Sequence, residues 1–189
     1  MQIDSELIQS CKKGNRKAQF DLYKQCFSCL MSVCLRYKNN YSEAEESLNM
    51  GFFKVLDNLG KYSAKVPFDA WIKRIMINLL IDEFRASKKY HETIEYRDFQ
   101  EKQSVIENTD SNDAQKNYDA EELELMLKAL PPLTQKVFNL YAIDGYNHKE
   151  IAEMLGMAEG TSKWHVSSAR KQLQEKLNIQ QKAEKNLYE

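Results

Sequence analysis

The stretch from Gly145 to Leu173 constrains the fold of this chain most tightly, because it marks two short helices and the turn between them. Asn147 with Glu150 three residues later is a capping pair that starts the first helix, and Gly156 supplies the left-handed residue that ends it. A second helix is predicted to begin between residues 159 and 161. Such a pair is the pattern of a helix-turn-helix, which can lay its second helix in the major groove of DNA.

The second helix has one apolar and one polar face. At about 100° per residue, a buried stripe is predicted at Val166, Ala169, Leu173 and Leu177. The opposite side carries Thr161, Trp164, Ser168 and Lys171, with His165 and Ser167 at its edges. Trp164 is expected to point away from the core, and hydroxyls, a cation and an aromatic ring suit a DNA groove. The alternative is an ordinary helical hairpin with a solvated outer face.

The remaining sequence predicts an all-α fold. Apolar residues recur at helical spacing, alternating strand patterns are almost absent, and the chain has only 6 Gly and 3 Pro among 189 residues. No internal repeat is evident. In the N-terminal part we expect four helices, at Asp4–Lys13, Arg16–Tyr37, Ser42–Asn58 and Phe68–Lys89.

The last of these helices is apolar around most of its circumference, but one polar stripe interrupts it. Trp71, Arg74, Asn78, Arg85 and Lys89 recur at intervals of three, four and seven residues and so lie on one side. Cations with an aromatic ring and an amide can hold a phosphate backbone and an unpaired base. The preceding loop, LGKYSAKVP, carries Lys61 and Lys65 and could approach the same strand. The competing interpretation is a solvated edge with a buried Trp71.

Net charge divides the chain into three parts. It is −1 overall, but +5 over residues 1–90, −8 over residues 91–124 and +2 over residues 125–189. Residues 91–118 are polar and poorly periodic, which favours a flexible acidic linker. We therefore predict a first domain at 1–90, a linker at 91–118, a helix-turn-helix domain at 119–178 and a polar tail at 179–189. Charges this modest predict weak intrinsic affinity for duplex DNA.

Several classes of protein lack support. Cys11, Cys26, Cys29 and Cys34 interleave with apolar residues, while the three His are remote in sequence, so we expect buried reduced thiols and no metal or cofactor. No zinc cluster, phosphate-binding Gly-rich loop or two-metal acidic pair indicates an enzyme. No apolar run reaches about 18 residues and no signal peptide is recognisable, so a cytoplasmic location is expected.

In series, these segments resemble the extracytoplasmic-function (ECF) class of bacterial sigma factors over nearly the whole chain. SEAEESLNMGFFKVLDNLGKY is similar to that family's polymerase-binding helix. FDAWIKRIMINLLIDEFR matches its helix for the −10 promoter element. The stretch from LPPLTQKVF through EIAEMLG to EGTSK is similar to its −35-binding domain. The resemblance implies a region 2 domain and a region 4 domain in a factor that directs core RNA polymerase to promoters and helps to open them.

The resemblance also implies roles for individual residues. Core polymerase would be bound by Glu43, Glu46, Asn49, Phe53 and Asp57. The single-stranded non-template strand at −10 would be met by Lys61, Lys65, Trp71, Arg74, Asn78, Arg85, Lys88 and Lys89. Duplex at −35 would be met by Thr161, Lys163, Trp164, His165, Ser167, Ser168, Arg170 and Lys171. An anti-sigma factor is a further expected partner, and the acidic linker would thread into the RNA path of the polymerase.

The sequence departs from the family pattern in both predicted interfaces. Asn49 and Met50 replace a usual Gln and acidic residue on the polymerase-binding helix. On the recognition helix, His165 and Ser168 replace frequent Arg residues, which lowers the attraction to phosphates. The rival class is a stand-alone helix-turn-helix regulator, which would bind duplex without polymerase but would leave the Trp71 stripe unexplained.

Overall fold

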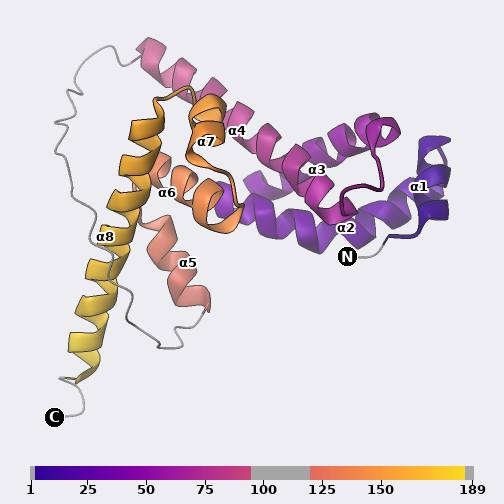
Figure 1. Ribbon diagram of the computed structural model, residues 1–189. Coiled ribbons are helices and arrows are strands. Elements are labelled where there is room, and N and C mark those ends of the chain that lie inside the picture. Colours follow the sequence, from indigo (N-terminus) through magenta and orange to yellow (C-terminus); the bar gives the residue numbers. More distant parts are fainter. Residues whose placement is uncertain (1–2, 95–119, 186–189) are drawn as a thin grey trace. The chain divides into compact units, whose positions relative to one another are not determined.

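The computed structural model describes residues 3–94 and 120–185, and all regular structure within them is helical (Figure 1). The side chains of residues 88–94, 120–122 and 178–185 lie outside that description, as does the predicted linker beyond residue 94. The elements are α1 (Ser5–Lys12), α2 (Arg16–Tyr37), α3 (Tyr41–Asn58), η1 (Leu59–Lys61), α4 (Phe68–Ile94), α5 (Ala120–Lys128), α6 (Pro132–Phe138), η2 (Asn139–Ile143), α7 (His148–Leu155) and α8 (Glu159–Lys185).

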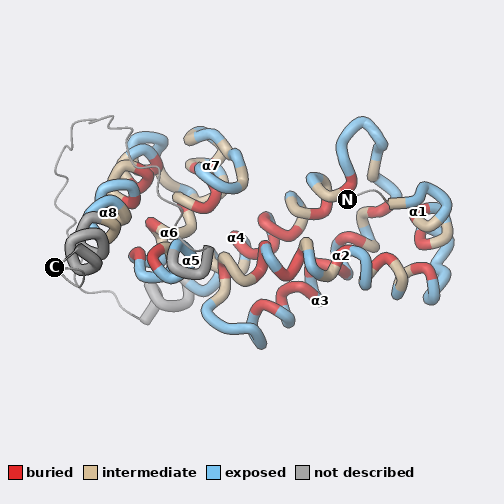
Figure 2. Tube along the Cα trace, turned by 90° about the horizontal axis from the view of Figure 1, so that it is seen from below, coloured by how far each residue is buried: buried red, intermediate tan, exposed pale blue. Residues whose placement is uncertain are grey.

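The chain divides into two compact units, Met1–Tyr96 and Arg97–Glu189. In the N-terminal unit α2 packs against both α3 and α4, while α1 packs against α2 and η1. Buried residues follow the inward faces of these helices (Figure 2). Fully enclosed side chains include Leu22, Leu30, Leu48, Ile72 and Met76. This burial on three helices supplies the apolar core of the unit.

The helix starts of this unit follow from local sequence. Asn15 and Asn40 are extended N-cap residues whose side chains accept hydrogen bonds from the amides of Ala18 and Glu43. These caps satisfy backbone donors that the first turn leaves free. The helix expected at 16–37 has its predicted bounds, and α4 begins at residue 68 as predicted. α1 is one residue shorter at each end than predicted, and α3 begins one residue earlier.

Gly51 allows α3 and α4 to approach closely. A Cβ at this position would overlap the buried thioether end of Met76 and would also crowd Leu79. At the present spacing of the two helices, a larger residue would therefore displace the end of the Met76 side chain. The outward face of α3 and the polar stripe of α4 are fixed relative to each other by this contact.

The four cysteines are free, as expected. Cys11, Cys26 and Cys34 are buried and Cys29 is partly buried. Burial raises the pKa of both Cys26 and Cys34 to about 12. A thiol with such a pKa is almost entirely protonated near neutral pH and is a poor nucleophile.

In the C-terminal unit α8 packs against both α6 and α7, and α5 contacts α6 and α8. The residues predicted to start and end α7 are confirmed. Asn147 and Glu150 form a reciprocal capping box, with both bonds at 2.9 Å, and Gly156 ends the helix in the left-handed region at φ 67°. The second helix begins at Glu159, within the predicted range. Residues 145–173 therefore form the expected helix-turn-helix.

Two helices are longer than predicted. α4 continues to Ile94, so residues 91–94 are helical where the linker was expected to begin. α8 continues to Lys185, which makes residues 179–185 helical where a polar tail was expected. Polar composition misled the prediction here, because Lys, Glu, Gln and Arg are good helix formers when a helix is already nucleated.

Candidate nucleic-acid interface

The stripe on α4 presents polar side chains to solvent. Arg74, Asn78 and Arg85 are exposed, as the helical spacing predicted. Lys88 and Lys89 belong to the helix, but their side chains lie outside the described part. Two guanidinium groups with an amide between them form a surface that can bind a phosphate backbone and the edge of a base.

Trp71 departs from the expected exposed stacking platform. Trp71 is half-buried, and its ring centroid lies 5.7 Å from that of Phe68 and 5.1 Å from that of Tyr62. Tyr62 also meets Phe68 edge-on at 5.0 Å. The three rings form an aromatic cluster at the start of α4, so that only part of Trp71 remains available to a ligand.

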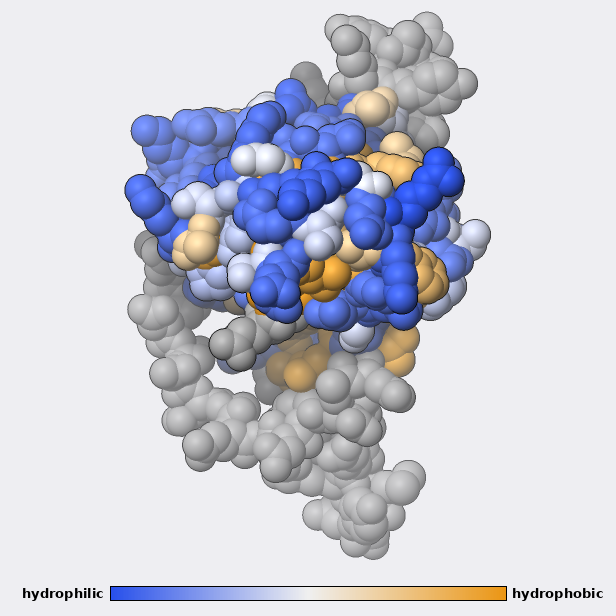
Figure 3. All heavy atoms as spheres, turned by 90° about the vertical axis from the view of Figure 1, so that its right-hand side faces the viewer, coloured by the Kyte–Doolittle hydropathy of each residue, from blue (hydrophilic) through white to orange (hydrophobic). Residues whose placement is uncertain are grey.

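The two expected lysines lie at the end of η1 (Lys61) and in the loop between η1 and α4 (Lys65). Lys61 and Lys65 are exposed, and Lys61 Nζ donates to Asn58 Oδ1 at 2.9 Å. Figure 3 looks onto the α1 end of the N-terminal unit, where the surface is mostly hydrophilic with a small apolar area. Exposed cations here can meet phosphates without desolvating a buried charge.

The outward face of α3 brings together all the residues predicted to bind a protein partner. Glu43, Glu46, Asn49, Phe53 and Asp57 are exposed, and Phe53 is 68% exposed. Met50, three residues before Phe53, is also exposed, and two neighbouring apolar side chains with a polar rim are compatible with a protein-binding surface.

Sequence reasoning did not predict the exposure of two apolar side chains in this unit, nor one polar contact of Asn49. Met50 is exposed on α3 and Phe20 on α2. Tyr23 Oη donates to Asn49 Oδ1 at 3.0 Å, and the Tyr23 ring packs edge-on against Phe52. Helical periodicity placed Asn49 outward, but the tyrosine on α2 that fixes its amide could not be found without knowing how α2 and α3 pack.

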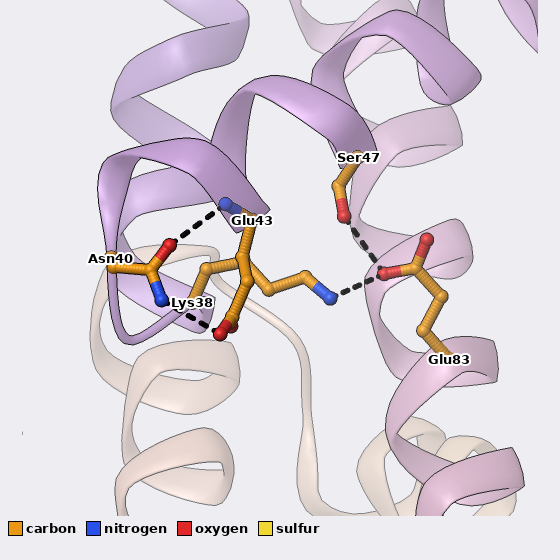
Figure 4. Close-up of polar contacts among 5 residues, drawn as sticks. All are labelled: Lys38, Asn40, Glu43, Ser47 and Glu83. Carbon is orange, nitrogen blue, oxygen red and sulfur yellow. Dashed lines mark hydrogen bonds and ion pairs between the residues drawn. The ribbon is translucent and has the colours of Figure 1, made fainter.

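A polar network ties α3 to its neighbours (Figure 4). Ser47 Oγ donates to Glu83 Oε2 at 2.9 Å, and Lys38 Nζ is 2.7 Å from the same oxygen. Asn40 Nδ2 donates to Glu43 Oε1 at 2.7 Å, so the carboxylate of Glu43 also serves the cap of α3. Glu83 thereby joins the end of α2, the middle of α3 and the stripe-bearing helix α4 through one carboxylate.

The polar face of α8 is only partly as expected. Lys163, Arg170 and Lys171 are exposed, while Thr161, Ser167 and Ser168 are half-buried. Lys163 Nζ pairs with Glu159 Oε1 at 2.8 Å, an exposed ion pair that a phosphate could replace. This face has three cations and three hydroxyls, which suits a DNA groove.

His165, expected at the edge of the polar face, is buried instead. His165 is 4% exposed, and its Nδ1 lies 3.0 Å from Oγ1 of the buried Thr134 on α6. Because α8 is covered by α6 as well as α7, its buried face is wider than the apolar stripe and includes Ser162, His165, Val166 and Ala169. Leu173 and Leu177, predicted in that stripe, are only half-buried.

Trp164 does not point freely into solvent as periodicity suggested. It is half-buried, its ring lies edge-on to His165 at 4.9 Å, and its Nε1 is buried without a hydrogen-bond partner among the described residues. A buried indole N–H without a partner is unfavourable. The indole therefore contributes to the packing of the unit as well as to the surface of α8.

A second histidine that the sequence did not single out links the two helices of the motif. The His148 ring stacks on Tyr141 at 4.4 Å and 15°, and its Nδ1 lies 3.0 Å from Ser162 Oγ. The guanidinium carbon of Arg170 lies over the Tyr141 ring, 5.9 Å from its centroid. Burial, followed by nearby Lys163, lowers the pKa of His148 below its ordinary value of 6.5. A neutral imidazole suits a site beside two cations.

Among the described side chains, no group of three or more His, Cys, Asp or Glu is arranged to hold a metal ion. Within residues 3–94 and 120–185, no helix combines the length and apolar character needed to span a membrane.

Comparisons with known proteins agree on one family. Residues 22–90 match the family model described as Sigma-70 region 2, and residues 120–173 match Sigma-70, region 4. The chain is 26% identical over 176 residues to ECF RNA polymerase sigma factor SigW of Bacillus subtilis, covering 90% of this chain and 94% of that protein. It is 24% identical over 170 residues to ECF RNA polymerase sigma factor SigM of Mycobacterium tuberculosis, covering 90% and 82%.

Among solved structures, the fold is similar to that of the sigma factor RpoE from Bartonella quintana, crystallised with the anti-sigma factor NepR. The TM-score is 0.51 at 20% identity, and the match covers 84% of this chain and 98% of that one.

Proposed function

Since this chain belongs to the ECF class of the sigma-70 family and is an initiation factor that directs RNA polymerase to promoters, we propose specific roles for the surfaces described above. The observation that carries this proposal is the exposure of Arg74, Asn78 and Arg85 along one side of α4, in the unit that also presents an apolar, polar-rimmed face on α3. One unit thus has both a surface for single-stranded DNA and a surface for a protein.

The α4 stripe and the loop before it bind the non-template strand at the −10 element. Arg74 and Arg85, with Lys61, Lys65, Lys88 and Lys89, attract phosphates. Asn78 is placed to bond the edge of an extruded base, and the free part of Trp71 can pack against it. Extruding a base costs a few kcal/mol, so the opened strand must gain contacts that the duplex lacks.

The outward face of α8 binds duplex at the −35 element. Thr161, Lys163, Ser167 and Ser168 face the groove, with the exposed part of Trp164 beside them, and Arg170 and Lys171 bind phosphates. His165 takes no part in this surface. Three cations on the face make the −35 contact weak alone, so that binding depends on the second unit and on polymerase.

The exposed face of α3 binds core RNA polymerase. Phe53 and Met50 supply apolar area, Asn49 supplies an amide whose carbonyl oxygen is already bonded to Tyr23, and Glu43, Glu46 and Asp57 form the polar rim. We assign the domains as residues 1–90 and 119–178, connected by the acidic segment 91–118 and followed by 179–189.

The family also suggests an anti-sigma factor as a regulatory partner, since the RpoE structure contains one. As a binding factor for polymerase and DNA, the chain would act without catalytic residues of its own. Its place of action would be the cytoplasm, where the bacterial polymerase meets the chromosome.

Promoter binding with and without core polymerase tests the proposal against the rival reading. The chain should shift promoter DNA tightly only when core polymerase is present, and tight binding by the chain alone would support a stand-alone regulator. The match of residues 22–90 to region 2 argues against that rival, because a stand-alone regulator has no need of a polymerase-binding unit.

Asn78→Ala tests the −10 role separately. The variant should form a closed complex but give weak permanganate reactivity of promoter thymines, since the extruded base loses its edge contact. Lys163→Ala is the matched control, which should weaken closed-complex binding and leave opening of the bound fraction intact. Permanganate footprints as strong in Asn78→Ala as in the unaltered protein would refute the role of Asn78.

A further inference from the structure

Tyr62 connects the loop at residues 62–67 to the first turn of α4. Its ring meets the buried Phe68 edge-on at 5.0 Å and lies 5.1 Å from Trp71. These two contacts hold the ring on the helix independently of its hydroxyl group. The aromatic cluster therefore fixes the first residue of the loop against α4.

The hydroxyl of Tyr62 closes the loop. Tyr62 Oη donates to the backbone oxygen of Val66 at 3.1 Å, which joins the first residue of the loop to the one before Pro67. Inside this span, the Val66 amide donates to Ser63 O at 3.3 Å and the Lys65 amide is 3.5 Å from Ser63 Oγ. Both inner contacts are longer than the tyrosine bond, which is the only side-chain hydrogen bond among the described residues that spans the loop from residue 62 to residue 66.

The position of this loop relates it to the −10 surface. Trp71 precedes Arg74 by three residues and Asn78 by seven, so these three residues share one side of α4. Because the ring of Tyr62 lies against Trp71, the loop is held at the N-terminal end of the exposed stripe. Lys65 and the backbone groups of the loop are exposed beside it.

We propose that Tyr62 is a positioning residue for base selection at the −10 element, an inference that rests on the proposed function. Its hydroxyl holds the loop in one shape, so the extruded base meets polar groups at fixed places. Hydrogen bonds to base edges depend steeply on direction, whereas attraction to phosphates does not. Release of the loop therefore reduces discrimination among bases more than it reduces overall affinity for the strand.

Tyr62→Phe removes the hydroxyl and keeps both ring contacts, so the variant should fold as the unaltered protein does. Holoenzyme assembled with core polymerase is titrated with four single-stranded non-template oligonucleotides that differ only at the extruded base. The ratio of cognate to non-cognate affinity should fall by about threefold to tenfold, the effect of one ordinary hydrogen bond. Tyr41→Phe removes an exposed hydroxyl in the same unit and should keep the ratio.

The outcomes separate this inference from the function on which it rests. If the unaltered holoenzyme binds all four oligonucleotides alike, the proposed −10 role fails. If it discriminates and Tyr62→Phe discriminates equally well, Tyr62 has no positioning role although the function stands. An equal loss of affinity for all four oligonucleotides also overturns the inference, because Tyr62 would then act on the strand as a whole. Thermal unfolding of each variant shows that the comparison is made on folded protein.

Discussion

Replacing His165 with alanine is expected to destabilise the C-terminal unit rather than to remove a DNA contact. The imidazole is 4% exposed, and its partner Thr134 is 3% exposed. Truncation leaves the Thr134 hydroxyl without this bond in a buried place, which costs about 1–3 kcal/mol. The vacated space adds the cost of a large-to-small core substitution, so the total is about 2–5 kcal/mol.

Calorimetry of the full chain can measure this effect. For a unit of this size, about 1 kcal/mol shifts the melting temperature by about 4–8 °C, so His165→Ala should lower the transition of the C-terminal unit by roughly 10 °C or more. Lys163→Ala is the matched control from the same helix. Its side chain is 60% exposed, and the variant should melt nearly as the unaltered protein does while binding −35 duplex more weakly as holoenzyme.

One result would refute the reasoning. If His165→Ala melts like the unaltered protein and yet weakens −35 binding as much as Lys163→Ala does, the imidazole acts at the DNA surface and not in the packing between α8 and α6. A lower melting temperature with normal −35 binding at low temperature, where both variants are folded, is the outcome that the burial of His165 predicts.

Three further predictions concern stability and reactivity. Burial and nearby cations lower the pKa of His148, so the unfolded chain binds a proton at this residue more readily than the folded chain does. The free energy of unfolding should therefore decline as the pH falls below about 6.5. In melts between about pH 7.5 and 5.5, His148→Gln should flatten this dependence. Gly51→Ala should lose up to about 2 kcal/mol in denaturant unfolding, because an overpacking cost of about 1–3 kcal/mol against the buried Met76 is partly offset by a gain of about 1 kcal/mol in helix propensity; a raised midpoint would contradict this. Cys26 and Cys34, with pKa values of about 12, should react with a disulfide reagent at pH 7.5 about a hundredfold or more slowly in the folded chain than in the denatured one, and equal rates would show that they are accessible.

The Glu83 carboxylate connects the helices that carry the two surfaces proposed to bind polymerase and the −10 strand. Through Ser47 and Lys38 it joins α3 to α4 and to the end of α2. The close approach at Gly51 restrains the same two helices from the apolar side. If α3 binds polymerase and α4 binds the opened strand, as proposed, these contacts keep the two surfaces in a fixed relation.

Most of the fold could be predicted from sequence because its signals are local. The cap formed by Asn147 and Glu150, the left-handed Gly156 and the starts of α2 and α4 each depend on a few neighbouring residues. The exposure of Arg74 and Asn78 likewise follows from helical periodicity on a helix with one polar stripe. Helix ends in polar sequence were predicted poorly, because Ile94 and Lys185 lie in segments whose composition suits both helix and linker.

The sequence by itself therefore determined that the fold is helical, where the helix-turn-helix lies and which family the motifs resemble, since these depend on spacing along one chain. Only the tertiary structure decided that His165 is a core residue, that Trp164 is half-buried, and that Tyr62 reaches Val66. Periodicity gives the direction of a side chain about its own helix axis. It does not give the number of elements packed around that helix, and the packing of α6 against α8 is what turned an expected DNA contact into part of the core.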